Sequence, residues 1–256
     1  MHNTPAGLSP ILTAILLSSL LLSPAQSHAA TETTDTTSKT APTPKPTPVP
    51  EINNLFQVHY EARVRSFSEQ NQVHKNVVLL GDSITEGFTL KDYLPGRRVI
   101  NRGIGGDIIG NDAAPGDKRG LLNRLNESVF DCAPTHLFIL IGINDIGQGH
   151  TPEQVEKGYR ELLIKIRERM PQLKIYVQSL LPTRDRFDKH NPAILDANER
   201  LKKVASEFNC EYLDLHTAMA DDEGKLKADW TNDGLHIKEP AYKAWAEIVE
   251  EHAGWK

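Results

Sequence analysis

Short apolar segments alternate with helix-forming segments over most of the chain. Strands are expected at residues 76–80, 98–101, 136–141, 174–179 and 211–215, where brief runs are mostly apolar, as in strands buried on both faces. Helices are expected at residues 53–70, 152–169, 191–208 and 240–252, where apolar residues recur at helical spacing. Such alternation predicts an α/β fold in which helices cover both faces of a parallel sheet.

Composition excludes several classes of protein. The 256 residues contain 29 Lys and Arg against 34 Asp and Glu, a net charge of -5, so the basic surface of a nucleic-acid-binding protein is absent. An apolar content of 39% is enough to bury a core and excludes disorder for most of the chain. Two cysteines are too few for a disulfide scaffold or a Cys-based zinc site.

The N-terminal segment has the pattern of a signal peptide. Residues 1–31 contain no Asp, Glu, Lys or Arg, and residues 11–22 are almost continuously apolar. This run is shorter than the roughly 20 residues that span a bilayer, and small residues at 27 and 29 suit a cleavage site. Residues 1–29 are therefore predicted to be a signal peptide that exports the protein to the periplasm or the medium. Because no Lys or Arg precedes the apolar run, an uncleaved anchor stays an alternative.

Residues 30–50 are rich in Thr and Pro and predict an extended linker. The folded domain is expected at residues 51–256, about 205 residues, which is a usual size for one domain. After signal cleavage no stable membrane span is expected.

Polar residues follow the predicted strands at the sheet edge where ligands of α/β proteins bind. Ser83 lies in GDSITEG directly after the first strand, and Asn144 lies in GIND after the third. A Ser hydroxyl becomes a nucleophile when a base removes its proton. The alternative is that Ser83 caps a helix, with Glu86 three residues later completing a capping box.

Two further motifs supply groups that would complement such a nucleophile. Asp233 and His236 are three residues apart in DGLH, so the carboxylate can orient the imidazole as a base. The alternative is a turn Asp beside an incidental surface His. The glycine-rich stretch 101–107 lets backbone N–H groups approach a ligand oxygen, and Asn144 could donate to the same oxygen or be a plain turn residue.

Taken together, GDSITEG, NRGIGGD, GIND and DGLH resemble the four sequence blocks of the SGNH (GDSL-type) hydrolases. The resemblance covers residues 76–236. It implies a flavodoxin-like three-layer α/β/α sandwich with five parallel strands in the order 2-1-3-4-5. It also implies ester hydrolysis through an acyl-serine intermediate, with no metal ion or organic cofactor.

The resemblance assigns roles to individual residues. Ser83 resembles the family's nucleophile, His236 its base and Asp233 the acid that orients the base. The Ser83 N–H, the Gly106 N–H and the Asn144 side chain resemble the donors of the oxyanion hole.

The choice of Gly106 rests on its place in the glycine-rich stretch. The resemblance selects it over Gly103 and Gly105 because it directly precedes the Asp, as in the family's GGD-type variant.

Substrate contacts are expected from an inserted loop and from one aromatic residue. The loop at residues 108–120 is predicted to be mobile and to lie at the site mouth, so Asp107 and Asn111 are candidate substrate-binding residues; a harmless surface insertion is the alternative. Trp230, three residues before Asp233, could stack on a sugar ring or simply pack.

The favoured function is hydrolysis of short-chain, chiefly acetyl, esters of small molecules or carbohydrates. A lysophospholipase or thioesterase is an alternative, and a non-catalytic carbohydrate-binding protein is a weaker one. A metal-dependent phosphodiesterase using Asp82, Asp233 and His236 is disfavoured because no further cluster with metal-ligand spacing occurs. The sequence makes no prediction of an oligomeric state.

Cys132 and Cys210 precede the third and fifth strands. In the order that the resemblance implies, one strand separates them, which puts their Cα atoms about 9–10 Å apart. Since a disulfide requires less than about 7 Å, two buried free thiols are predicted.

Overall fold

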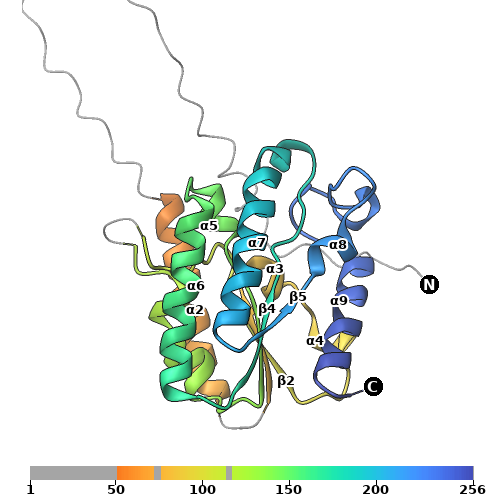
Figure 1. Ribbon diagram of the computed structural model, residues 1–256. Coiled ribbons are helices and arrows are strands. Elements are labelled where there is room, and N and C mark those ends of the chain that lie inside the picture. Colours follow the sequence, from red (N-terminus) through yellow and green to blue (C-terminus); the bar gives the residue numbers. More distant parts are fainter. Residues whose placement is uncertain (1–50, 72–75, 114–116, 256) are drawn as a thin grey trace, which may run out of the picture. The chain divides into compact units, whose positions relative to one another are not determined.

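Five parallel strands form one sheet (Figure 1), and their order is β2-β1-β3-β4-β5. The strands are β1 Val77–Gly81, β2 Val99–Gly103, β3 His136–Leu140, β4 Lys174–Gln178 and β5 Glu211–Leu213. Every residue of β1 is buried, as is usual for an interior strand of a sheet covered on both faces. The predicted fold class and strand order are confirmed.

The computed structural model describes residues 51–71, 76–113 and 117–255, with only the backbone at 51–54. The predicted signal peptide at 1–29 and linker at 30–50 lie outside the described residues. The chain divides into two compact units, each defined by the contacts among its own residues. The unit Phe56–Lys256 contains the sheet. None of the described helices is both long and apolar enough to cross a membrane.

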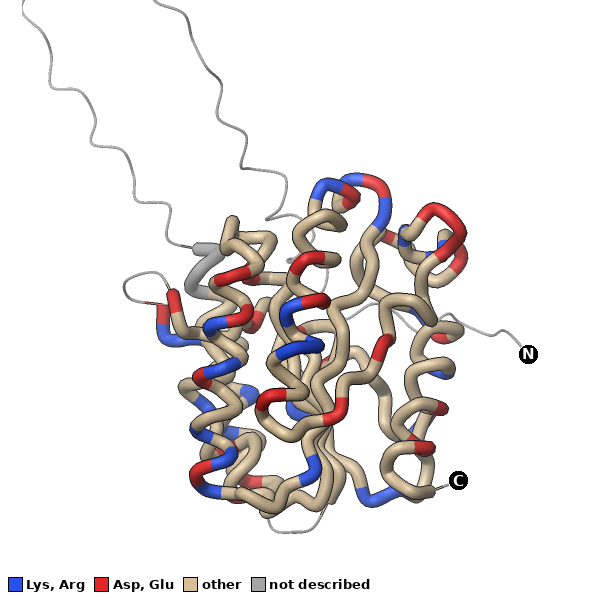
Figure 2. The backbone as a smooth tube through the Cα atoms, in the orientation of Figure 1, with Lys and Arg blue, Asp and Glu red and all other residues tan. Residues whose placement is uncertain are grey.

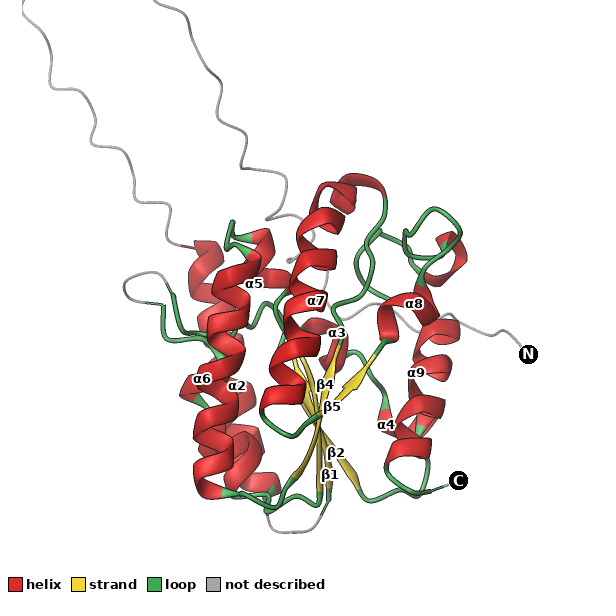
Figure 3. Cartoon of the chain, viewed as in Figure 1, coloured by secondary structure: helices red, strands yellow, loops and turns green. Residues whose placement is uncertain are grey.

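Helices enclose the sheet. Figure 3 shows the sheet between a layer that contains α2 (Glu51–Gln70) and α6 (Pro152–Arg169) and a layer that contains α9 (Glu239–His252). The other helices are α3 Ser83–Glu86, α4 Leu90–Tyr93, α5 Ile143–Gly147, α7 Asn191–Glu207 and α8 Leu215–Met219. Along α6 and α7, basic and acidic residues are interspersed (Figure 2), and both Arg160 and Arg200 pair with Glu156.

Local sequence signals explain where the elements begin and end. Helix α6 begins after Thr151, whose hydroxyl accepts the Gln154 N–H while the Gln154 side chain returns to the Thr151 N–H, a capping box. The fifth strand ends at Leu213, two residues before its predicted end. The reason is that Asp214 caps α8 by accepting the Thr217 N–H, which turns the chain out of the sheet.

The two cysteines are free thiols, as predicted. Cys132 is buried, but Cys210 is only half-buried, so the prediction that both are buried is wrong. Cys210 lies in the exposed turn from α7 into β5, where the Arg167 guanidinium donates to its sulfur at 3.4 Å.

The carboxyl ends of the three adjacent strands β2, β1 and β3 bring the predicted motifs to one edge of the sheet. Ser83 follows β1 and Asn144 follows β3. At the end of β2, Gly103 lies directly against α3, because a Cβ on Gly103 would be 2.1 Å from the backbone nitrogen of Glu86. Only glycine permits this contact, which holds the turn after β1 against the glycine-rich stretch after β2.

Candidate active site

A chain of hydrogen bonds joins Ser83, His236 and Asp233. Ser83 Oγ lies 3.0 Å from His236 Nε2, across 153 residues of sequence. His236 Nδ1 lies 2.7 Å from Asp233 Oδ2. When Nδ1 carries the proton that faces the carboxylate, Nε2 is the acceptor for the Ser83 hydroxyl.

The turn after β1 leaves the Ser83 hydroxyl available for this contact. Asp82, and not Ser83, is the N-cap of α3, and its Oδ1 accepts the Ile84 N–H at 3.0 Å. The alternative interpretation of Ser83 as a capping residue is therefore wrong. Ser83 is the first residue of the helix, and its side chain faces His236.

A tight turn fixes Asp233 beside the imidazole. Its Oδ1 accepts the backbone N–H groups of Leu235 and His236, at 2.9 and 2.8 Å, which leaves Oδ2 for the ring. Gly234 has a φ of +87°, and a Cβ there would be 2.2 Å from the Arg184 carbonyl oxygen. The turn thus needs glycine both for its left-handed backbone and for its close approach to the segment after β4.

These hydrogen bonds keep Asp233 ionised. Burial raises the pKa of its carboxyl, but the hydrogen bond and the charge of His236, with the two backbone N–H groups, outweigh burial and lower the pKa to about 2. An ionised carboxylate at this position stabilises the imidazolium that forms when His236 takes a proton.

The glycine-rich stretch leaves one N–H group available next to the site. The Gly103 N–H donates to Asn101 Oδ1 at 2.8 Å, and the Gly105 N–H donates to Glu86 Oε2 at 2.6 Å. Within the part of the chain that the structure describes, no hydrogen bond occupies the Gly106 N–H. The Gly106 N–H thus stays free for another acceptor, and the choice of Gly106 as an oxyanion donor stays a prediction.

Asn144 is held by one of its two amide N–H groups. Its Nδ2 donates to the Asp107 carbonyl oxygen at 2.8 Å, and a primary amide has a second N–H for another acceptor. The neighbouring Asp145 is buried and accepts the Ile109 N–H at 3.1 Å. These hydrogen bonds thus join the start of α5 to residues 107–109.

Asp107 is not placed to bind a substrate, and this prediction is wrong. Its side chain is fully buried and pairs with the fully buried Arg124 at 2.8 Å. Burial raises the pKa of Asp107, an effect that the charge of Arg124 opposes. The carboxylate is therefore a partner of the guanidinium inside the protein.

Arg124 is the main residue that the sequence analysis missed. Its guanidinium donates to the carbonyl oxygens of Gly81 at 3.0 Å and Arg102 at 2.9 Å, besides the Asp107 carboxylate. It thereby joins the ends of β1 and β2. The available signal was its place between Leu121, Leu125 and other residues that are buried, since a charged residue within an apolar stretch must find a partner.

The inserted loop is anchored more firmly than predicted. Ile108 and Ile109 are fully buried, and the Tyr60 hydroxyl donates to the Gly120 carbonyl oxygen at 3.0 Å. Asn111 donates to the Gln154 carbonyl oxygen of α6 at 3.3 Å. A role of Asn111 in substrate binding stays a prediction, as does any role of residues 114–116, which lie outside the described residues.

Trp230 packs against the core and is half-buried. The Lys227 ammonium lies 4.2 Å from the centre of its ring, a cation–π distance. These contacts match the packing interpretation, and stacking on a sugar stays a prediction.

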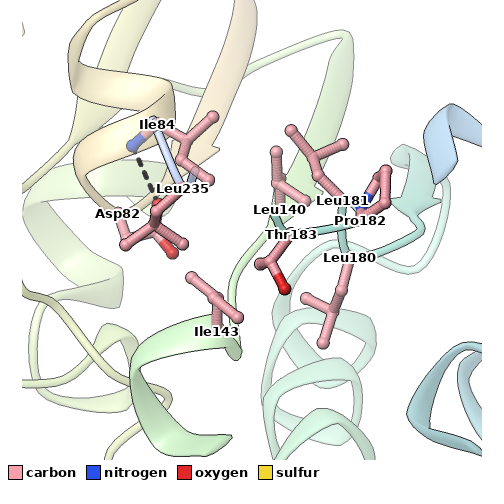
Figure 4. A pocket seen from close by; sticks show the side chains of 9 residues that line it. All are labelled: Asp82, Ile84, Leu140, Ile143, Leu180, Leu181, Pro182, Thr183 and Leu235. Atoms are coloured by element: carbon pink, nitrogen blue, oxygen red, sulfur yellow. Dashed lines mark hydrogen bonds between the residues drawn. The ribbon is translucent and has the colours of Figure 1, made fainter. Parts of the chain in front are cut away.

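A small apolar cavity of about 10 Å³ lies beside the catalytic candidates. Three of its lining residues are sequence neighbours of these candidates: Asp82 and Ile84 flank Ser83, and Leu235 precedes His236. In Figure 4, Asp82, Ile84 and Leu235 lie across the cavity from Leu180. Asp82 is fully buried, and its Oδ2 has no hydrogen-bond partner among the described residues. Burial raises the pKa of Asp82 to about 7.

A metal centre has no support in the described ranges, where no group of three or more His, Cys, Asp or Glu side chains is placed to hold an ion. Both Asp233 oxygens accept hydrogen bonds from the DGLH turn itself.

The chain is similar to known proteins in sequence and in fold. Residues 79–244 match the GDSL-like lipase/acylhydrolase family. The human platelet-activating factor acetylhydrolase IB subunit alpha1 (Homo sapiens) is 24% identical over 187 residues, which are 70% of this chain and 75% of that protein. The orthologue from Pongo abelii is similar to the same extent.

Solved structures share the fold. A protein from Streptococcus pneumonia whose name refers to platelet activating factor has a TM-score of 0.70 at 24% identity, covering 78% of this chain and 95% of its own. A mutant of an acetyl-xylooligosaccharide esterase from Geobacillus Stearmophilus has a TM-score of 0.57 at 19% identity, covering 72% and 96%.

We predict that Arg124→Met destabilises the protein by about 3–5 kcal/mol, because the buried Asp107 carboxylate loses its partner. Urea unfolding at pH 7 measures the change. The double variant Asp107→Asn/Arg124→Met should recover part of the loss, and Arg65→Met, on the exposed side of α2, serves as the control. Equal stability of Arg124→Met and Arg65→Met would contradict the prediction.

We predict that ionisation of Asp82 lowers the free energy of unfolding as the pH rises. Its pKa is 3.8 in the unfolded chain and about 7 in the folded one, so its contribution is complete below pH 3.8 and is lost as pH approaches 7. Asp82→Asn keeps the capping oxygen and cannot titrate. The free energy of unfolding of wild type minus that of Asp82→Asn should therefore fall by at least about 1 kcal/mol between pH 4 and 7; a constant difference in urea unfolding would refute this.

Proposed function

This chain belongs to the GDSL-like lipase/acylhydrolase family, and we propose that it is a serine esterase that cleaves short-chain esters through an acyl-serine intermediate. The observation that carries the proposal is the hydrogen-bonded chain from Ser83 through His236 to Asp233. A hydroxyl, an imidazole and a half-buried carboxylate in this order activate a serine for nucleophilic attack.

In the acylation half-reaction, His236 Nε2 takes the proton of Ser83 as Oγ attacks the ester carbonyl carbon. Asp233, ionised because its pKa is about 2, stabilises the imidazolium. The oxyanion accepts hydrogen bonds from the Ser83 N–H, the Gly106 N–H and the second N–H of Asn144. Removal of one such donor typically costs about 10²–10³ in rate.

Collapse of the tetrahedral intermediate breaks the bond to the alcohol oxygen, which leaves with the proton from His236. The acyl group is then held by Ser83 Oγ. Water attacks this ester while His236 takes its proton, and a second collapse releases the carboxylic acid and restores the Ser83 hydroxyl. These steps balance with the chain's own residues and one water molecule.

The cavity beside Ser83 favours a small acyl group. A volume of about 10 Å³ is close to what one water molecule needs, so an acetyl methyl group fits better than a long chain. The names of two similar proteins refer to acetyl groups, an acetylhydrolase and an acetyl-xylooligosaccharide esterase. Both points support acetyl esters, with a carbohydrate as one candidate alcohol, over lysophospholipids or long-chain thioesters.

We further propose that the enzyme acts outside the cytoplasm, in the periplasm or the medium. The proposal rests on the uncharged N-terminal stretch and its apolar run at 11–22, which have the pattern of an export signal.

Replacement of the nucleophile tests the function. Ser83→Ala should lower kcat for p-nitrophenyl acetate by at least about 10³-fold, because no other group can form the acyl-enzyme. Ser206→Ala, an exposed serine of α7, is the matched control and should keep wild-type activity. Hydrolysis by Ser83→Ala at the wild-type rate, or a wild type without activity on an ester panel, would refute the proposed function.

The cavity predicts a preference for short acyl chains. For p-nitrophenyl esters, kcat/KM should fall by at least about tenfold, or 1.4 kcal/mol, between acetate and octanoate. Leu180→Ala, which enlarges the cavity, should raise the butyrate-to-acetate ratio of kcat/KM. Leu195→Ala removes an exposed leucine of α7 and should leave the ratio unchanged. A Leu180→Ala ratio equal to that of wild type would contradict the assignment of the cavity.

A further inference from the structure

One face of helix α2 lies on the glycine loop, which we define as residues 103–107. Phe56, His59 and Arg63 follow one another at helical spacing and share this face. The Phe56 ring covers Gly106 so closely that a Cβ there would lie 2.6 Å from the ring. Arg63 Nη2 donates to the Gly103 carbonyl oxygen at 2.9 Å. Helix α2 therefore contacts the glycine loop at two places, through Arg63 at Gly103 and through Phe56 at Gly106.

Glu86 lies between α2 and the glycine loop. Its Oε2 accepts the Gly105 N–H at 2.6 Å and lies 3.0 Å from His59 Nε2. Its Oε1 lies 3.3 Å from Arg63 Nε. Burial by itself would raise the pKa of Glu86. The hydrogen bond from His59 and the charge of Arg63 outweigh this effect, so the pKa lies below its usual value. The carboxylate is thus an ionised acceptor fixed by two side chains of α2.

The Gly105–Gly106 peptide, which carries the Gly106 N–H, lies between two peptides that side chains hold. Glu86 accepts the N–H of the Ile104–Gly105 peptide at 2.6 Å, and Arg119 Nη1 donates to the carbonyl oxygen of the Gly106–Asp107 peptide at 2.9 Å. Two adjacent glycines are otherwise the most mobile stretch that a backbone can contain. The direction of the Gly106 N–H, which lies within this stretch, therefore depends on these contacts.

We propose that Glu86, supported by His59 and Arg63 of α2, is a positioning residue that aims the Gly106 N–H at the oxyanion. The inference rests on the proposed function, in which Gly106 is an oxyanion donor. Glu86 itself acts through the backbone and touches neither the substrate nor Ser83 in this role. Helix α2 then contributes to the rate of the reaction although it carries none of the catalytic candidates.

The experiment compares three variants of the full chain on p-nitrophenyl acetate. Glu86→Ala removes the acceptor of the Gly105 N–H and should lower kcat by about 10–100-fold, with KM within about twofold of wild type because ground-state binding is unaffected. Glu86→Gln keeps an acceptor oxygen and should recover most of kcat. Glu69→Ala, an exposed glutamate of the same helix α2, loses the same charge and should match wild type.

A second measurement separates positioning from loss of fold. Phenylboronic acid forms a tetrahedral adduct with an active serine, so its inhibition constant should rise in Glu86→Ala by about the same factor as kcat falls. Amide exchange of the 103–107 segment, which needs no activity, should be faster in Glu86→Ala than in wild type. Thermal melting and active-site titration give the folded fraction by which each rate is corrected.

Three results would overturn the inference: equal kcat in Glu86→Ala and Glu69→Ala after that correction, a Glu86→Gln variant as slow as Glu86→Ala, or unchanged amide exchange at 103–107. A wild type without esterase activity would count against the proposed function. The ratios between variants and the exchange data test only the positioning role.

Discussion

The buried guanidinium of Arg124 is the interaction on which the site depends. A charge without access to water is tolerated only when its donors find acceptors, and here the acceptors are the Gly81 and Arg102 carbonyl oxygens and the Asp107 carboxylate. Gly81 is the last residue of β1 and Arg102 is the last but one of β2, while the Asp107 carbonyl oxygen accepts a hydrogen bond from Asn144. The need to satisfy one cation thus fixes the relative positions of the turn before Ser83 and the glycine loop.

Much of this arrangement could be predicted from the sequence. Buried parallel strands are short apolar runs, and their carboxyl ends meet at one edge of the sheet, so Ser83 and Asn144 were expected to lie together. The spacing of Asp233 and His236 matches a turn in which a carboxylate contacts an imidazole. Pattern and topology are enough for such residues because their neighbours lie in the same turn or at the same sheet edge.

The residues that were misassigned have partners that no local pattern indicates. Asp107 looked like an exposed loop carboxylate, whereas its partner Arg124 is 17 residues away. Glu86 appeared only as the end of a capping box, although its contacts come from α2, with His59 27 residues distant. Each case requires the three-dimensional packing of separate elements.

The contact between Ser83 and His236 spans 153 residues, and the intervening chain forms β2 to β5. Contacts this distant in sequence form slowly and late, because the chain loses the entropy of a large loop before such contacts stabilise the fold. An incompletely folded or nascent chain therefore exposes an ordinary, unreactive serine. The hydrogen bond between Ser83 and His236 forms only with the finished sheet, so any activity that depends on this contact is absent until folding is complete.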